Sequence, residues 1–233
     1  VGSEMCVRDR VGAALGSALT GLRPVAEIMY MDFITCAMDQ ICNQAAKLRY
    51  ISNGQVSVPV VYRMCTGRSK SNAAHHSGSF YSWFINTPGL KVVLPSTPYD
   101  AKGLIVSAIR DNGPVIYLGH KLLYNIRGEV PEESYEIPLG VADVKQEGTD
   151  LTLVATGGMV PLSLAAAGTL ALVLYIEPLS WMELRFVMGF CFSSLFTALE
   201  SRLHGAAATQ ARGREPSTPR FVALCSATRP RPL

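Results

Sequence analysis

Two adjacent histidines, His75 and His76, are the side chains in this sequence best suited to proton transfer. They follow a stretch of small and polar residues at 67–74 and precede an aromatic run at 80–84. An imidazole exchanges a proton close to neutral pH, and residues that carry chemistry often lie on loops held by rigid elements. A histidine on such a loop also commonly serves only to bind the backbone, so this pattern leaves both roles open.

An aromatic residue next to a predicted strand offers a second kind of chemistry. Phe33 follows an apolar run at 24–31, which is typical of a buried strand and which contains Met29. An aromatic face can pack on a flat heterocycle, although the pattern alone favours a plain core role for Phe33. The histidine loop follows another predicted strand at 58–62. Phe33 and His76 are therefore both expected at the carboxyl edge, where parallel sheets bind ligands.

Strands and helices alternate along the first half of the chain. Short apolar runs between turn residues predict strands, and apolar residues at helical spacing predict helices. This order predicts an α/β fold, a mostly parallel sheet with helices on both faces. Asp32 is predicted to cap one of the helices. Strands are expected at 24–31, 58–62, 90–94 and 115–118, and helices at 11–22, 33–48, 80–84 and 99–110.

The composition excludes several classes of protein. Apolar residues make up 48% and charged residues 17% of the 233 residues, which supports a substantial core rather than a disordered chain. A net charge of +3 is too small to indicate nucleic-acid binding. The six cysteines include no CxxC pair, which favours free thiols in a reducing compartment over a zinc site or a disulfide framework. No secretory signal is expected in the first residues.

The chain is expected to divide into five stretches. The last of them is apolar and then rich in Arg, Pro and Ser, and a change of reading frame near residue 165 would explain it. The alternative is a membrane anchor at 160–176, which at 17 residues is at the short limit for a span. The stretches are an N-terminal segment (1–10), an α/β domain (11–125), an exposed connection (126–149), the start of a second domain with a strand at 150–156 (150–165), and the tail (166–233).

A series of linked motifs resembles one family. The segments are GLRPVAEIMYMDF, MDQICNQAAK, PVVYR, AAHHSGSFYSWF, PGLKVVLPSTPYDAKGL and AIRDNGPVIYL, in this order. In order and spacing they resemble the beta subunit of thiamine-diphosphate-dependent 2-oxoacid dehydrogenases, which act on pyruvate, branched-chain 2-oxoacids or acetoin. The resemblance covers residues 12–160 and implies the transketolase-like pyrimidine-binding domain of that family.

The resemblance implies one half of a shared active site. An alpha subunit holds the diphosphate and its magnesium ion, and the beta subunit binds the aminopyrimidine ring in an α2β2 assembly. A glutamate of the beta subunit activates the cofactor, which carries the decarboxylation of a small 2-oxoacid. The acyl group then passes to a lipoyl acyltransferase core. Such enzymes work in the bacterial cytoplasm or the mitochondrial matrix.

The resemblance also assigns roles to single residues. It implies that His76 assists proton transfer during acyl transfer to the lipoyl group, that Phe33 packs on the aminopyrimidine, and that Met29 touches the same ring. His75 is a variable neighbour in the family. A structural potassium ion is implied as well, bound by the backbone oxygens of Val60, Ala108 and Asp111.

The activating glutamate is where this chain departs from the family. Counting back without gaps from residues 21–24, its position falls on Val7. Glu4 lies three residues upstream of that position. Either Glu4 serves through a local insertion, or the first ten residues are foreign sequence.

Two other functions stay open. Transketolase and deoxyxylulose-phosphate synthase belong to the same superfamily, but they carry both cofactor-binding halves on one chain, and no GDG…N motif for the diphosphate is present in this sequence. The non-enzymatic alternative is a catalytically inactive or membrane-associated structural subunit of the same family, suggested by the apolar run at 160–199.

Overall fold

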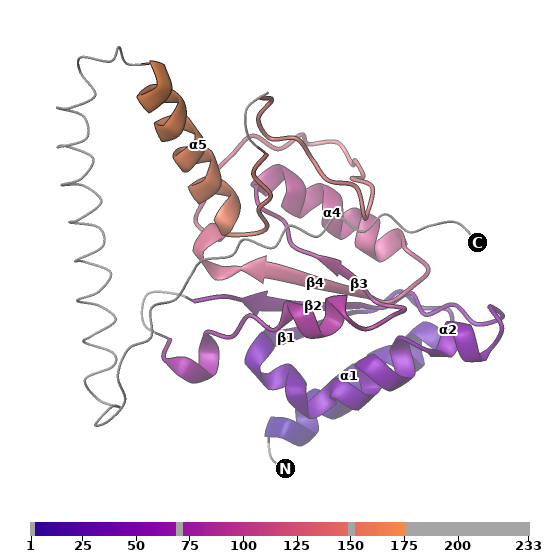
Figure 1. Ribbon diagram of the computed structural model, residues 1–233. Helices are drawn as coiled ribbons and strands as arrows, with labels where there is room; N and C mark the ends of the chain where they lie inside the picture. Colours follow the sequence, from indigo (N-terminus) through magenta and orange to yellow (C-terminus); the bar gives the residue numbers. More distant parts are fainter. Residues whose placement is uncertain (1–2, 69–71, 149–151, 176–233) are drawn as a thin grey trace, which may run out of the picture. The chain divides into compact units, whose positions relative to one another are not determined.

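The core of the protein is a parallel sheet of four strands, which confirms the predicted fold class. The computed structural model describes residues 3–68, 72–148 and 152–175. The strands lie side by side in the order β1, β2, β4, β3, and each pair of neighbours runs parallel (Figure 1). They span Val25–Tyr30 (β1), Val61–Thr66 (β2), Lys91–Val93 (β3) and Val115–His120 (β4).

Helices cover both faces of the sheet, as predicted. In Figure 1, α1 lies below the sheet and α4 above it. α1 begins at Ser3, so the expected start of this helix near residue 11 is wrong. The helical elements are α1 (Ser3–Leu19), η1 (Met31–Ala37), η2 (Asp39–Ala45), α2 (Leu48–Ile51), η3 (Ala74–His76), α3 (Tyr81–Ile85), α4 (Pro98–Arg110) and η4 (Lys121–Leu123).

Two apolar clusters hold these layers together. The larger cluster joins one face of the sheet to α1, η1, η2 and α3. The smaller cluster joins the other face to α4 through Ala108. Among the fully buried side chains of the larger cluster are Val11, Ile28, Tyr62, Met64, Phe84, Ile116 and Leu118, and the smaller one contains Val61, Val93, Val115 and Tyr117.

The second strand differs from its prediction. We expected it at 58–62, but pairing with β4 begins at Val61 and continues to Thr66. Val58 and Val60 are fully buried although they precede the paired stretch. An apolar run in a sequence indicates that its residues are buried. In this segment the buried residues begin before the residues that pair with β4.

The helix predicted at 33–48 forms in three pieces. η1 is a 3-10 helix, η2 is a π-helix and α2 is a single α-helical turn. The buried residues of this stretch are three apart at first and four apart later: Met31, Ile34, Ala37, Ile41 and Ala45. A 3-10 helix repeats every three residues and a π-helix has a wider turn than an α-helix. The two periods therefore keep these five side chains on the side that faces the core.

Asp32 is not a helix cap, so that prediction is wrong. η1 is preceded by Tyr30, and Asp32 lies inside η1. The Asp32 carboxylate instead accepts a hydrogen bond from the backbone N–H of Gly78, with Gly78 N to Asp32 Oδ1 at 2.9 Å. A contact 46 residues away along the chain is not visible in local sequence.

Beyond η4 the chain has little regular structure up to α5 (Met159–Tyr175). Residues 124–148 form neither helix nor strand and are mostly exposed. Residues 152–156 form no strand either, so the strand predicted at 150–156 is wrong for the residues that the structure describes. In the described residues, no helix combines the length and the apolar character needed to cross a membrane. The chain divides into two units between Leu164 and Ala165, and most of the expected tail at 166–233 lies outside the described residues.

Candidate active site

Three strands end at the same edge of the sheet, and each delivers one side chain of the candidate site. β1 runs directly into η1, which carries Phe33. β2 is followed by the loop in which η3 carries His76, and β4 is followed by η4, which starts with Lys121. Parallel strands place their carboxyl ends at one edge, where ligands of α/β sheets bind. The topology thus gathers residues that are far apart in the sequence.

Phe33, His76 and Tyr30 form an aromatic cluster at this edge. The ring centroids of Tyr30 and His76 lie 4.6 Å apart, and those of Phe33 and His76 lie 5.4 Å apart, with nearly perpendicular rings in both pairs. Phe33 keeps 39% of its surface exposed, so aromatic surface stays available to a flat partner. Tyr30 was missed by the sequence analysis, because its contact with His76 spans two strand ends.

The loop that carries His76 is fastened at Gly78. The Gly78 N–H donates to Asp32, and the Gly78 carbonyl accepts from the Gly67 N–H at 2.9 Å and from the Thr66 hydroxyl at 3.2 Å. A Cβ added at Gly78 would lie 2.4 Å from Phe80 Cε2 and 2.6 Å from Asp32 Oδ1, so a larger residue would displace the Phe80 ring or the Asp32 carboxylate. Short polar contacts, rather than burial, position the loop.

Lys121 joins the third strand end to the same loop. Its ammonium group donates a hydrogen bond to the carbonyl of His76. The same Nζ lies 5.1 Å from the centroid of the Tyr30 ring, within the range of a cation–π interaction. In the sequence, Lys121 shows only as a lysine three residues after the strand predicted at 115–118.

The two other histidines near this edge lie differently. His75 is exposed in η3. The ring of His120 fills the space in front of Gly67, where a Cβ would collide with it. Burial lowers the pKa of His120, and the positive charges of Lys121 and Arg68 lower it further. A packed imidazole in front of Gly67 fits a structural role for His120.

The residues expected to contact and activate the aminopyrimidine ring do not all lie beside Phe33 and His76. Met29 is 68% exposed and points to the face of β1 opposite the buried side chain of Ile28. Val7 packs against the larger apolar cluster. Glu4 lies in the first turn of α1, and its side chain is outside the described part of the chain. The position at which the resemblance implies a glutamate is therefore filled by an apolar side chain.

Val60, Ala108 and Asp111 lie at the opposite, amino edge of the sheet. The Val60 carbonyl accepts a hydrogen bond from the Val115 N–H at 2.9 Å, and the Asp111 carbonyl accepts one from Arg23 at 2.9 Å. A carbonyl oxygen has two lone pairs, so either oxygen can also face an ion. A potassium site there stays a prediction. Within the described ranges, no three His, Cys, Asp or Glu side chains converge on a metal position.

A cavity of about 500 Å³ lies between the end of β4 and the start of α4. Its lining includes Tyr117, His120 and Tyr124. The volume is in the range of small-molecule sites. None of the three aromatic-cluster residues lines it, so we assign it no part in the candidate site.

Comparison with known proteins identifies the relatives of this chain. Residues 8–127 match the model of the family described as transketolase, pyrimidine binding domain. The chain is 52% identical over 161 residues to an acetoin:2,6-dichlorophenolindophenol oxidoreductase subunit beta of Bacillus subtilis, covering 69% of this chain and 47% of that protein. It is 50% identical over 160 residues to the pyruvate dehydrogenase E1 component subunit beta of the same organism, covering 68% and 49%.

Two further comparisons complete this picture. The 2-oxoisovalerate dehydrogenase subunit beta of Bacillus subtilis is 48% identical over 157 residues, covering 67% of this chain and 48% of that protein. Among solved structures, a split gene transketolase described as an inactive beta4 tetramer matches with a TM-score of 0.56 and 23% identity, over 73% of this chain and 50% of that one. The latter likeness concerns the fold alone. The chain spans about half the length of the curated relatives it matches.

Proposed function

The chain belongs to the transketolase pyrimidine-binding domain family, and we propose that it is the part of a 2-oxoacid dehydrogenase beta subunit that binds the aminopyrimidine ring of thiamine diphosphate. The observation that carries this proposal is the contact of Phe33 with His76, whose ring centroids lie 5.4 Å apart at the carboxyl edge. The similarity to beta subunits of acetoin, pyruvate and 2-oxoisovalerate enzymes supports it.

The residues at this edge fit a flat heterocycle. Phe33 presents partly exposed aromatic surface, and the Tyr30 and His76 rings stand beside it. Thiamine diphosphate, when bound, supplies the electron sink for decarboxylation. The part of this chain is to hold the ring against Phe33 and to offer the His76 imidazole for proton transfer during acyl transfer.

The activating carboxylate is assigned to Glu4 in this proposal. Val7 fills the implied position and packs on the core. Residues three apart in a helix lie on the same face, one turn from each other. Positions 4 and 7 both belong to α1, so a carboxylate at position 4 starts one turn from the implied place.

The chain works with partners in this proposal. An alpha subunit binds the diphosphate and the magnesium ion and completes an α2β2 assembly, and a lipoyl acyltransferase core accepts the acyl group. The substrate is a small 2-oxoacid or acetoin. A structural potassium ion at the carbonyls of Val60, Ala108 and Asp111 belongs to the same proposal, as does a bacterial cytoplasmic or mitochondrial matrix location.

Reconstitution tests the proposal. The chain is co-expressed with the alpha subunit of a related enzyme, and decarboxylation of pyruvate and branched-chain 2-oxoacids and cleavage of acetoin are measured with and without thiamine diphosphate. We expect cofactor-dependent turnover that Glu4→Gln abolishes and that Val7→Glu increases. Membrane fractionation is run in parallel. A complex that assembles but binds no thiamine diphosphate, even with Val7→Glu, overturns the proposal and favours an inactive structural subunit.

A further inference from the structure

Lys121 is a charged side chain to which the proposed function gives no task. It is half-buried and is the first residue of η4, directly after β4. Its ammonium group contacts the His76 carbonyl and the face of the Tyr30 ring. In the described part of the chain no carboxylate forms an ion pair with it. A half-buried lysine held by a carbonyl and a ring needs an explanation.

Both partners of Lys121 are linked to the same imidazole, that of His76. One partner is the carbonyl of His76 itself. The other is Tyr30, whose ring stands perpendicular to the His76 ring at 4.6 Å. A charge-assisted hydrogen bond is stronger than a neutral one, and a cation over an aromatic face adds to it. Both contacts restrict the same histidine.

We propose that Lys121 is the positioning residue that holds His76 in the aromatic cluster. Tyr30 ends β1, His76 lies in the loop after β2, and Lys121 follows β4, so the contacts of Lys121 connect the ends of three strands. Two of these strands, β1 and β4, are not neighbours, because β2 lies between them. The importance of Lys121 for catalysis rests on the proposed function, but its effect on the position of His76 can be measured without turnover.

The second anchor of the loop lies two residues further on. Gly78 is bound to Asp32 and to the end of β2, and none of these contacts involves Lys121. Loss of the ammonium group therefore frees the His76 peptide while the Gly78 anchor remains. This separation predicts a local loss of order at His76 rather than unfolding of the loop.

Lys102 provides a matched control. Its ammonium group donates to the backbone carbonyls of Pro131 and Glu132 and lies 5.4 Å from the centroid of the Tyr135 ring. It thus makes the same two kinds of contact as Lys121, but from α4, on the opposite face of the sheet from the larger apolar cluster. Lys102→Met removes equivalent chemistry from a place that does not touch the aromatic cluster.

The test is NMR of the histidine ring protons in the full chain. Two perpendicular aromatic neighbours displace the His76 ring signals from those of a free histidine, whereas the exposed His75 serves as an internal reference. We expect Lys121→Met to remove at least about half of this displacement, since a charge-assisted bond is lost. Lys121→Arg should keep most of it, and Lys102→Met should keep all of it. In the reconstituted complex, Lys121→Met should lower kcat roughly tenfold, with KM for the 2-oxoacid changed less than about twofold.

Three results would overturn the proposal. They are equal spectra for Lys121→Met and Lys102→Met, no recovery with Lys121→Arg, or a kcat unchanged by Lys121→Met. If Lys121→Met does not fold, Lys121→Gln against Lys121→Arg decides: only the glutamine should release His76, and equal spectra reject the proposal. A wild-type complex without thiamine-diphosphate-dependent turnover contradicts the proposed function, and in that case the NMR comparison still tests the positioning of His76.

Discussion

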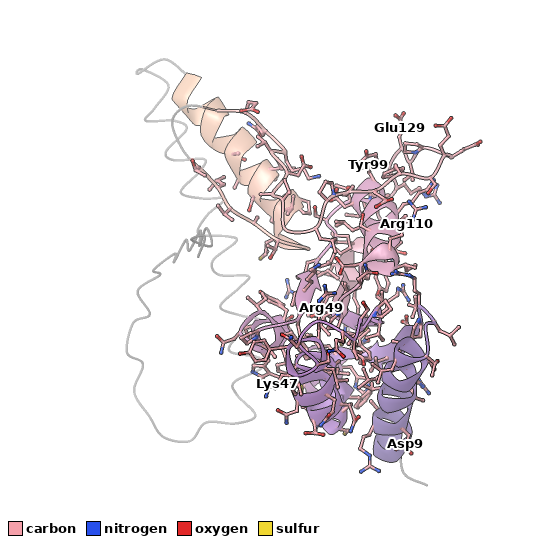
Figure 2. All side chains as sticks on the ribbon, turned by 90° about the vertical axis from the view of Figure 1, so that its right-hand side faces the viewer. Asp9, Lys47, Arg49, Tyr99, Arg110 and Glu129 are labelled. Carbon is pink, nitrogen blue, oxygen red and sulfur yellow. The ribbon has the colours of Figure 1, made fainter. Side chains whose placement is uncertain are left out.

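At the amino edge of the sheet, Arg23 binds the end of α4 through three hydrogen bonds. Its guanidinium group donates to the carbonyls of Ile109 and Asp111 at 2.9 Å each and to the side chain of Asn112 at 2.6 Å. Arg110, the last residue of α4, is labelled in Figure 2. The donors of Arg23 are therefore used within the chain itself.

At the carboxyl edge, one basic residue again binds a backbone carbonyl, but aromatic surface stays open beside it. Lys121 holds His76, and Phe33 next to it remains 39% exposed. The helical segments that carry Phe33, His76 and Lys121 at this edge are short or irregular. The comparison shows that a basic residue joins chain segments by hydrogen bonds at both edges, and that aromatic surface stays exposed beside it at the carboxyl edge.

The largest effect is expected from a substitution in the core of the sheet, which supports both edges. Ile116 lies in β4, one of the two inner strands of the sheet, and is fully buried in the larger apolar cluster. Ile116→Ala should lower the free energy of unfolding by about 3–4 kcal/mol, the usual cost of such a cavity. Urea unfolding measures it, with Ile51→Ala, at a side chain 71% exposed, as the control. Equal losses for the two variants would show that β4 does not carry the core.

A change confined to the carboxyl edge should alter binding more than stability. Phe33→Ala removes the proposed ring contact and should weaken thiamine diphosphate binding by the reconstituted complex roughly 30-fold, about 2 kcal/mol. The melting temperature of the chain should change little, because Phe33 is partly exposed already. Cofactor titration and thermal unfolding check both points. Phe33→Tyr keeps the ring and serves as the control, and equal affinities for the alanine and tyrosine variants contradict the assignment.

The converse change is confined to the amino edge. Arg23→Ala removes three hydrogen bonds from an exposed guanidinium group and should lower the free energy of unfolding by roughly 1–2 kcal/mol, less than for buried bonds. Cofactor affinity should stay as in the wild type. Arg23→Lys should lose part of the stability. A clear fall in affinity for Arg23→Ala would mean that the two edges are coupled.

The smallest effect depends on pH. Burial raises the pKa of Asp100, but hydrogen bonds from Ser96, Lys145 and Thr97 outweigh it, and the net pKa lies below its usual value. The carboxylate therefore adds stability above the unfolded pKa, and this stability is lost as the pH falls through the folded value. Asp100→Asn should cost roughly 1 kcal/mol at pH 7, and the difference should fade as the pH drops below about 4.

Unfolding curves of both proteins at several pH values test this prediction. A difference between wild type and Asp100→Asn that persists unchanged at low pH would show that the packing of the side chain, not its charge, is what the substitution removes. Lys145→Met, which leaves the hydrogen bonds from Ser96 and Thr97 in place, should cost less than Asp100→Asn at pH 7.

Local sequence patterns predicted strands wrongly where apolar residues are not the residues that pair with a neighbouring strand. The strand expected at 58–62 starts three residues late, because Val58 and Val60 are buried before pairing begins. The apolar run at 152–156 resembles a strand but has no neighbour with which to pair in the described structure. A strand is defined by its partner, and a single sequence does not show the partner.

By itself, the sequence determined the parallel α/β fold and the family, and the order of its elements placed Phe33 and His76 at one edge. Parallel strands separated by crossover helices allow no other place for residues that follow strand ends. Only the tertiary structure decided that Tyr30 and Lys121 stand beside His76 and that Asp32 binds Gly78. These contacts join residues far apart in the chain, and their geometry depends on the twist and packing of the whole sheet.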